Sequence, residues 1–329
     1  MNNGKYITKV LSMISKANGV SLVSAALLVA LLAPGQAVFS QRYSAWSAPV
    51  NLGPEVNSPG FDGCPSITKD GLNLLFMSNG ETTSQDIYVS HRETADSPWN
   101  APTSLGPNIN TAAGELCPLL TISGRYLYFV SNRPGGCGDF DIYVARRVTK
   151  KGWTDWEEPV NLGCEVNSPG PEFSPSLFEN EDGTAELYFS SGLRPGGLGF
   201  GDIWVSRLQD DGSFGPATNV VELNTAANDL RPKIRARDGL EIFFDSNRPG
   251  SMLQDIYTST RECTTADCPW SMPVNLGPVV NSSAVDGGGM LSFDGTELYF
   301  MSNRPILGAS GDQDIYVTRR EKLKNAEVD

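Results

Sequence analysis

Five stretches of the chain share one pattern, in which an apolar run is followed by a polar, glycine-containing turn and a second apolar run. The copy at residues 127–144 reads LYFVSNRPGGCGDFDIYV. Its aromatic and β-branched residues favour a pleated, half-buried surface, and its Pro and Gly interrupt the run because they favour turns. The pattern predicts five β-hairpins, at residues 74–89, 127–144, 187–205, 242–258 and 298–317.

Each hairpin belongs to a longer repeat that starts at an aromatic residue. These aromatics recur at intervals of 53, 57, 58 and 56 residues, at Trp46, Trp99, Trp156, Phe214 and Trp270. A PVNLG-like segment follows, then an Asn, an acidic residue five positions later, a short strand and a tight turn such as Asp294-Gly295. Asp-Gly between apolar runs is a strong hairpin signal, so each unit predicts four antiparallel strands. Repeats of this length and content indicate a β-propeller.

The order of strands within the repeat predicts how the ring closes. The first repeat begins with an outer-strand segment at residues 46–53, and the last ends with its third strand at residues 314–317. We therefore expect the N-terminal strand to complete the last blade, which leaves no open edge between blades. The predicted fold is all-β: a five-bladed β-propeller of four-stranded antiparallel blades over residues 41–320, followed by a polar tail at 321–329.

The N-terminal 40 residues have the features of a secretory signal peptide. Three lysines precede an apolar run at residues 20–33, which is short for a membrane span of about 20 residues. An uncleaved anchor is the alternative. Removing residues 1–40 changes the net charge from −13 to −16, and this acidity argues against nucleic-acid binding because phosphate groups are repelled. We expect a periplasmic or secreted mature protein without a membrane span.

Export would place the six cysteines in an oxidising compartment, where disulfide bonds persist. Spacing and repeat position suggest three pairs: Cys263 with Cys268, Cys137 with Cys164, and Cys64 with Cys117. The first pair is local in sequence, and the second falls in loops that the repeat places at one end of the propeller. The third pair occupies equivalent positions in successive repeats. Equivalent positions point the same way around a ring, so this third pairing stays open.

The SNRPGG…DIYV hairpin is preceded in the chain by a segment with the pattern P-x-[ILF]-x-x-[DS]-G-x-x-[LI]-[YF]-F. Together, the two segments resemble the repeats of the TolB-like propeller family. The resemblance covers residues 46–320. It implies a secreted or periplasmic β-propeller. The chain departs from the family pattern by having five repeats where the Tol translocation protein has six, and by showing neither its N-terminal domain nor a peptidoglycan-binding domain after the repeats. The resemblance therefore implies a fold and a compartment, and no partner.

One carboxylate per repeat directly precedes the predicted innermost strand: Asp62, Glu115, Glu172, Asp229 and Asp286. We expect these acids to ring the mouth of the central channel, where five like charges would repel one another. They would then need arginine partners, hydrogen bonds or a cation, and a hard cation such as Ca²⁺ would suit an all-oxygen ring. Arg231, two residues after Asp229, is a candidate partner. The structural alternative is that each acid caps backbone amides of its own loop.

An arginine recurs in the hairpin turn of four repeats: Arg133, Arg194, Arg248 and Arg304. As ligand-binding residues, these arginines would form a basic collar around the acids. As structural residues, they would bridge neighbouring blades through charge-assisted hydrogen bonds, and we favour this second interpretation.

The regular repeats and the scarcity of catalytic motifs favour an exported, non-catalytic propeller over an enzyme. The single histidine excludes a histidine metal cluster, and no nucleotide-binding or serine-hydrolase motif occurs. We expect a monomer, without a required cofactor, that binds a protein or a cell-envelope glycan through the end carrying the acids and arginines. The alternative is a glycoside hydrolase, in which Asp62, Glu115 and Glu172 would supply a base, a tuned acid and an orienting group.

Overall fold

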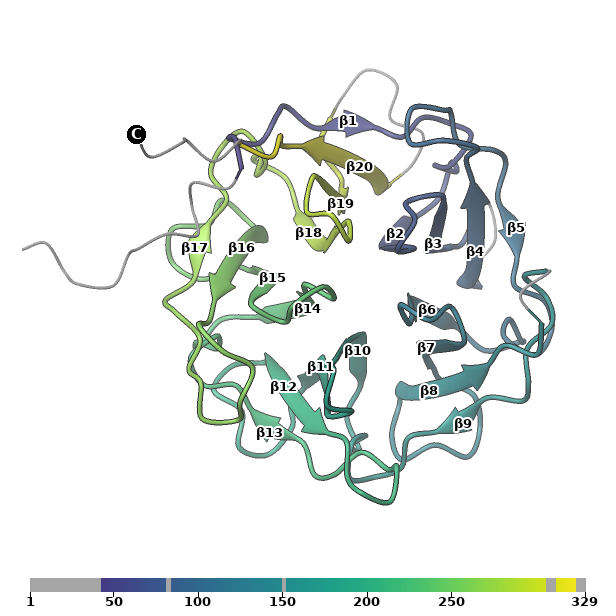
Figure 1. Ribbon diagram of the computed structural model, residues 1–329, viewed down its shortest axis with the longest axis vertical. Helices are drawn as coiled ribbons and strands as arrows, with labels where there is room; N and C mark the ends of the chain where they lie inside the picture. Colours follow the sequence, from purple (N-terminus) through teal and green to yellow (C-terminus); the bar gives the residue numbers. More distant parts are fainter. Residues whose placement is uncertain (1–42, 81–83, 150–151, 306–311, 324–329) are drawn as a thin grey trace, which may run out of the picture. The chain divides into compact units, whose positions relative to one another are not determined.

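The computed structural model describes residues 43–80, 84–149, 152–305 and 312–323. Its strands form five four-stranded antiparallel sheets, arranged as the blades of a propeller around a central axis (Figure 1). This arrangement confirms the predicted fold class. The predicted signal peptide lies outside the described residues, as do residues 324–329 of the predicted tail. In the described part of the chain, no apolar helix reaches membrane-spanning length.

Four strands make each blade, and the blades are numbered 1 to 5 in chain order from β2. The innermost strands are β2 (Asp62–Ile67), β6 (Glu115–Leu120), β10 (Glu172–Glu179), β14 (Asp229–Ile234) and β18 (Asp286–Leu291). The second strands are β3 (Asn73–Ser78), β7 (Tyr126–Ser131), β11 (Ala185–Gly192), β15 (Glu241–Ser246) and β19 (Glu297–Ser302). The third strands are β4 (Asp86–His91), β8 (Asp141–Arg146), β12 (Gly201–Arg207), β16 (Asp255–Thr260) and β20 (Asp314–Arg319). The outermost strands are β5 (Thr103–Ser104), β9 (Val160–Asn161), β13 (Thr218–Asn219), β17 (Val274–Asn275) and β1 (Val50–Asn51).

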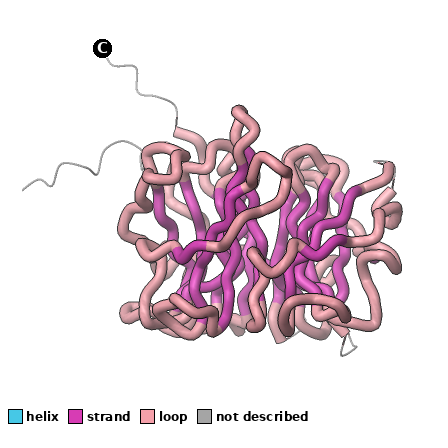
Figure 2. Tube along the Cα trace, turned by 90° about the horizontal axis from the view of Figure 1, so that it is seen from below, coloured by secondary structure: helices cyan, strands magenta, loops and turns pink. Residues whose placement is uncertain are grey.

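The strands run between two loop-covered ends of the propeller (Figure 2). We call the end where the inner strands begin the acid end. The opposite end, where a tight turn joins each inner strand to the second strand, is the turn end. The turn glycine has a positive φ in every blade: Gly71 (72°), Gly124 (67°), Gly183 (89°), Gly239 (65°) and Gly295 (80°). Glycine adopts this conformation without a side-chain clash, so the turns form where the Asp-Gly and Ser-Gly pairs predicted them.

Blade 5 combines the first and last described strands of the chain. β1 pairs antiparallel with β20, with Val50 opposite Val317 and Asn51 opposite Tyr316. The N-terminal strand therefore closes the ring, as the strand order predicted. This closure pairs the edge that an incomplete last blade would leave open to other chains.

The second strands form the centre of each blade and are covered on both faces. Their middle phenylalanine is at most 1% exposed in every blade: Phe76, Phe129, Phe189, Phe244 and Phe300. Each of them lies opposite an aromatic residue of the third strand, such as Tyr257 opposite Phe244. Cross-strand aromatic pairs stabilise a sheet. Burial on both faces explains why these strands read as continuous apolar runs.

A repeated asparagine joins successive blades near the acid end. In blade 2, Ile87 N donates to Asn110 Oδ1 at 2.9 Å, and Asn110 Nδ2 donates to Ile87 O at 2.8 Å. The side-chain amide thus satisfies both backbone groups of an isoleucine in the third strand of the preceding blade. The same pair of bonds recurs at Asn57, Asn167, Asn224 and Asn281. Because buried backbone groups need partners, this amide fixes the spacing between blades.

Three disulfide bonds link the six cysteines: Cys64–Cys117, Cys137–Cys164 and Cys263–Cys268. The last two confirm the predicted pairs, and the first, which the sequence left open, is also formed. Disulfide bonds of this number are typical of exported proteins.

Candidate active site

The five repeated acids are the first residues of the inner strands and lie at the acid end, around the axis (Figure 1). We expected them to ring the channel mouth, either as a ligand site or as caps of backbone amides in their own loops. Each of the five is 0% exposed, and a loop amide donates to each: Asp62, Glu115, Glu172, Asp229 and Asp286. The loop that leads into each inner strand folds over its acid, and this loop also provides the polar groups that hold the carboxylate.

Each acid accepts hydrogen bonds from a serine or threonine four residues earlier in its own loop. In blade 1, Ser58 N and Ser58 Oγ donate to Asp62 Oδ2 at 2.6 and 2.9 Å. In blade 3, Ser168 N donates to Glu172 Oε2 at 3.0 Å, and Ser168 Oγ donates to Oε1 at 2.5 Å. The other blades use Thr111, Thr225 and Ser282. Hydrogen bonds to a carboxylate are strong, so each acid fastens the loop at the entry to its blade.

Four of the acids also pair with the recurring arginines. The ion pairs are Arg133–Glu115 at 3.3 Å, Arg194–Glu172 at 3.8 Å, Arg248–Asp229 at 2.5 Å and Arg304–Asp286 at 2.5 Å. Each arginine also donates to a carbonyl of the loop before its acid, as Arg304 Nη2 does to Val280 O at 2.7 Å. These ion pairs lie within one blade, because the hairpin turn and the inner strand of a sheet meet at the same end. The expectation that the arginines bridge neighbouring blades is corrected accordingly.

Blade 1 is the exception to this pairing. Its hairpin turn has Gly80 where the other blades have an arginine. Asp62 Oδ1 is buried and has no hydrogen-bond partner among the described residues. Burial raises the pKa of Asp62, while the hydroxyls of Ser78 and Ser58 act to lower it. Asp62 is therefore the repeated acid whose charge is least balanced by the described surroundings.

Glu172 of blade 3 is the second acid with an unusual environment. Burial raises its pKa from 4.5 to about 6, although Ser168, Ser191 and Arg194 all favour the ionised form. The arginine compensates weakly because Arg194 Nη1 stands 3.8 Å from Glu172 Oε1, the longest of the four ion pairs. A carboxyl with a pKa near neutrality can both donate and accept a proton at physiological pH.

Two residues after each acid, the inner strand contains a β-bulge that brings neighbouring blades together. The backbone there has a positive φ, including 49° at Cys64, 48° at Cys117 and 55° at Ser174. Bulges re-aim side chains, and here the re-aimed side chains of blades 1 to 3 meet. Cys64 and Cys117 form the disulfide with Cα atoms 4.7 Å apart, and Cys64 Sγ lies 3.9 Å from Ser174 Oγ. Equivalent positions can therefore bond across the ring, because at the bulge they converge.

Arg231 occupies the same bulge position in blade 4, and it does not pair with Asp229. Its Nε and Nη2 donate to the two carboxylate oxygens of Asp245 at 2.8 and 2.6 Å. Gly288 N, at the bulge of blade 5, also donates to Asp245 Oδ1 at 3.0 Å. The predicted Arg231–Asp229 pair is wrong because Arg248 already occupies Asp229.

Sequence reasoning missed two fully buried charged residues of blade 4, Asp245 and Lys233. Lys233 Nζ donates to Pro175 O of blade 3 at 3.2 Å, and burial lowers the pKa of Lys233 to about 7. Burial also raises the pKa of Asp245, which Arg231 acts to lower. A signal for Asp245 was present, because the segment IFFDS has an acid where the other copies have Met, Val or Ser.

A cation held by the ring of acids was one of the possibilities considered from the sequence. Within the described ranges, no group of three or more His, Cys, Asp or Glu side chains is placed to hold a metal ion. Each repeated acid is instead bound to its own loop, and four of them to an arginine as well.

Comparisons with known proteins relate this architecture to solved structures. No family model matches the chain, and no curated protein matches it in sequence. An α-L-arabinofuranosidase from Lactobacillus brevis is 13% identical, with 80% of this chain and 91% of that chain covered and a TM-score of 0.57. The endo-arabinase from Bacteroides thetaiotaomicron VPI-5482 is 16% identical, with 86% and 99% covered and a TM-score of 0.56. A GH62 hydrolase in complex with xylotriose is 12% identical, with 86% and 99% covered and a TM-score of 0.54.

At these identities the likeness establishes the fold. It also corrects the resemblance to the TolB-like family, because the matched structures are glycoside hydrolases and no family model supports TolB-like repeats. The hairpin motif reflects what a four-stranded blade needs at its turns, which unrelated propellers share. The same comparisons overturn the expectation of a non-catalytic binding propeller and the preference against an enzyme. The matched structures belong to the class named as the alternative, the glycoside hydrolases.

Proposed function

We propose that this chain is a glycoside hydrolase that acts on an oligosaccharide at the acid end of blades 1 to 3. The observation that carries the proposal is the state of Asp62, whose Oδ1 has no hydrogen-bond partner among the described residues. The other four repeated acids each have an arginine. Catalytic groups break the symmetry of a repeat fold, and Asp62 does so. The hydrolase structures with the same fold support this assignment, and one of them holds xylotriose.

The roles of the three acids follow from their surroundings. Glu172, with a pKa of about 6, suits the general acid that protonates the leaving oxygen of a glycosidic bond. Asp62, which is buried and lacks an arginine, suits the base that activates water. Glu115, on the inner strand between them and neutralised by Arg133 at 3.3 Å, suits an orienting role.

This assignment has a structural consequence. Asp62 and Glu172 are both 0% exposed, so an oligosaccharide can reach them only when the loops carrying Ser58 and Ser168 move aside. Hydrogen exchange at the amides of these two residues should therefore increase when a non-hydrolysed oligosaccharide binds. Exchange at the equivalent Ser282 of blade 5 should not change.

The proposal includes a compartment. Residues 1–40 would act as a removable signal peptide, and the monomeric propeller would work in the periplasm or outside the cell. The three disulfide bonds support this placement, because such bonds persist under oxidising conditions.

The deciding experiment measures sugar released by the full chain from arabinan- and xylan-derived oligosaccharides. Asp62→Asn and Glu172→Gln should each lower kcat by about 100-fold or more, which is the typical contribution of a positioned acid or base. Asp286→Asn is the matched control, because Asp286 has the same place in its repeat and is held by Arg304. The fraction of the Asp286→Asn variant that is folded should have the wild-type kcat. Absence of sugar release by the wild type, or equal loss in all three variants, would overturn the proposal.

A further inference from the structure

At the turn end, an arginine follows the third strand in four blades and stacks on a tryptophan at the start of an outer segment. We call these residues the junction arginines. The guanidinium-to-ring distances are 4.5 Å for Arg92 on Trp99, 5.6 Å for Arg147 on Trp156, 4.7 Å for Arg261 on Trp270 and 4.4 Å for Arg320 on Trp46. Such stacking holds each guanidinium at the boundary with the preceding blade.

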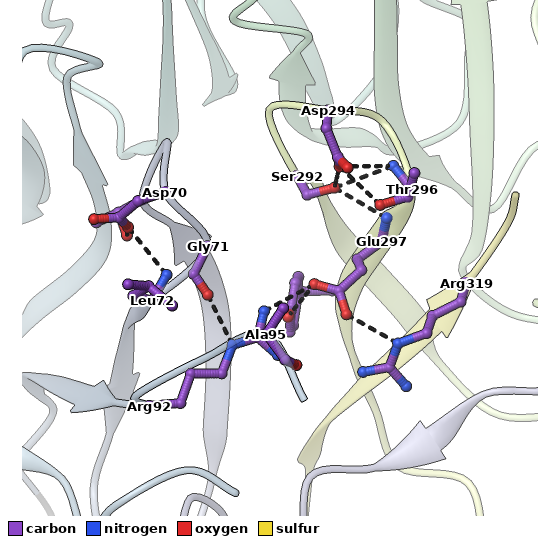
Figure 3. Close-up of polar contacts among 12 residues, drawn as sticks. Asp70, Gly71, Leu72, Arg92, Ala95, Ser292, Asp294, Thr296, Glu297 and Arg319 are labelled. Carbon is purple, nitrogen blue, oxygen red and sulfur yellow. Dashed lines mark hydrogen bonds and ion pairs between the residues drawn. The ribbon is translucent and has the colours of Figure 1, made fainter. Parts of the chain in front are cut away.

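Three junction arginines meet a glutamate at the start of the second strand in the preceding blade. The pairs are Arg92–Glu297 at 3.0 Å, Arg261–Glu186 at 2.7 Å and Arg320–Glu241 at 3.5 Å. Figure 3 shows the junction of blades 5 and 1, where Glu297 lies between Arg92 and Arg319. At these junctions the protein supplies the carboxylate that an arginine with a largely buried side chain needs.

Arg147, at the junction of blades 1 and 2, has no such glutamate. The equivalent residue of blade 1 is Asn73, whose Oδ1 lies 3.0 Å from His91 Nδ1. Arg147 donates to Gly152 O through Nε at 3.0 Å and Nη2 at 2.5 Å, and its guanidinium lies 3.9 Å from the ring centre of Trp153. No carboxylate of the described residues forms an ion pair with it. Accordingly, burial alone lowers the pKa of Arg147, whereas Glu241 counteracts burial at Arg320.

A hollow of about 640 Å³ opens where the glutamate is missing. Its lining includes Asn73, Arg147, Trp153 and the hydroxyl-bearing Thr68 and Thr121. This volume lies within the range of about 300–1,000 Å³ that small-molecule sites occupy.

The lining also contains one carboxylate, Asp70. Its Oδ1 accepts from Leu72 N at 3.0 Å (Figure 3). The same oxygen accepts from Thr68 Oγ1 at 2.5 Å, so it is engaged by the turn itself. The lining also contains Lys69, whose Nζ lies over the ring of Phe293 at 4.7 Å.

The geometry points to a binding site for an acidic saccharide at the junction of blades 1 and 2, in which a uronate carboxylate pairs with Arg147 and takes the place of the missing glutamate. Trp153 supplies an aromatic ring against which a sugar ring can pack. Asn73 and the threonine hydroxyls supply hydrogen-bonding groups for sugar hydroxyls. This mixture of an aromatic ring, hydroxyls and the cations of Arg147 and Lys69 favours an acidic saccharide over an acidic peptide. The site lies at the turn end, away from the acids proposed for hydrolysis.

The test measures binding of D-galacturonate to the full chain by titration calorimetry, with D-galactose as the neutral probe. Galacturonate should bind more tightly than galactose. Arg147→Gln should weaken galacturonate binding by about tenfold or more, as expected when a charge-assisted contact is lost. Asn73→Glu should do the same while preserving the fold, because it gives Arg147 the internal partner found at Arg320. Arg146→Gln is the matched control, since Arg146 is exposed and pairs with the exposed Glu157; its binding should not change.

Three outcomes would overturn the inference. Galacturonate could bind no better than galactose, its affinity could survive Asn73→Glu, or triglutamate could compete as well as galacturonate does. The last result would indicate a protein partner instead of a saccharide. Because no hydrolysis is measured, a failure here is separate from a failure of the proposed hydrolase activity.

Discussion

Blade 1 differs from other blades at both ends of its second strand, β3. At the acid end, Gly80 stands where blades 2 to 5 have an arginine, and Asp62 is left without the ion pair. At the turn end, Asn73 stands where blades 3 to 5 have a glutamate, and Arg147 of the next blade is left without a carboxylate. Two departures from the repeat, Asn73 at the start of β3 and Gly80 in the turn after it, therefore release one acid and one arginine from roles that are structural elsewhere.

Comparing blade 1 with blades 4 and 5 distinguishes the structural role of the repeated acid from its proposed function. In blades 4 and 5, the acid and arginine of the inner strand and hairpin turn bind each other and a loop, which accounts for their recurrence. In blade 1 the acid remains although its arginine is gone. Blade 1 also carries Cys64, whose bond to Cys117 joins it to blade 2 two residues from the unpaired acid. A covalent link can stabilise the region without neutralising Asp62.

The largest effect should separate Asp286→Asn from Asp62→Asn. Asp286→Asn leaves Arg304 buried and without its carboxylate, and breaking a buried pair costs about 3–5 kcal/mol. Asp62→Asn leaves no arginine unpaired and should lower the free energy of unfolding by about 1–2 kcal/mol, the cost of weakened hydrogen bonds. Urea denaturation of both variants measures the difference. Equal losses would show that blade 1 is held in the same way as blade 5.

A comparable effect should follow removal of the Cys64–Cys117 bond. The two cysteines are 53 residues apart, and closing a loop of that length stabilises a protein by about 4 kcal/mol in the chain-entropy model. The double variant Cys64→Ser/Cys117→Ser should lose about this much in urea denaturation. Removing Cys263–Cys268, which spans 5 residues, should cost about 2 kcal/mol by the same reasoning. An equal or larger loss for the short loop would contradict the role given to the bulge disulfide.

Glu172 should make stability depend on pH by a smaller amount. Its folded pKa of about 6 lies above the ordinary 4.5, so the folded protein binds a proton that the unfolded chain has lost. Its contribution is therefore complete below pH 4.5 and is lost as pH rises through about 6, by about 2 kcal/mol. The difference in unfolding free energy between wild type and Glu172→Gln, followed from pH 4.5 to 7, measures it. A difference that does not change with pH would refute the raised pKa.

The sequence was sufficient for the features that depend on local pattern. Apolar runs and Gly-containing turns located the second and third strands, and the order of Trp46 and Asp314 in the repeat predicted that β1 pairs with β20. The position of the five acids at the inner strands was also predictable. A residue that recurs in every repeat is needed at its position. Its recurrence does not show which atoms its side chain contacts.

The missed contacts are those that depend on convergence in three dimensions. Arg231 lies two residues after Asp229 and Arg248 lies nineteen residues after it, yet Arg248 pairs with Asp229 and the bulge directs Arg231 to Asp245. The same bulge brings Cys64 to Cys117, which spacing alone could not establish. The burial of the acids arises from loops whose path the pattern did not fix. The predicted family was wrong for a related reason. The hairpin motif reports the structure of a propeller blade, which does not identify the protein family.

The smallest effect tests the turn end of the comparison. Asn73→Glu places a carboxylate opposite Arg147, as Glu241 stands 3.5 Å from Arg320 in blade 4. Arg147 is half-buried and already held by Trp153, so little further side-chain entropy is lost when the pair forms. We expect a gain of about 1 kcal/mol in unfolding free energy, the upper range for a partly exposed pair, and a decrease of that gain in high salt. Asn73→Gln is the control, because it lengthens the side chain without adding a charge. A gain in both variants would show that the ion pair is not the cause, and the absence of a gain in Asn73→Glu would show that Arg147 does not lack a partner.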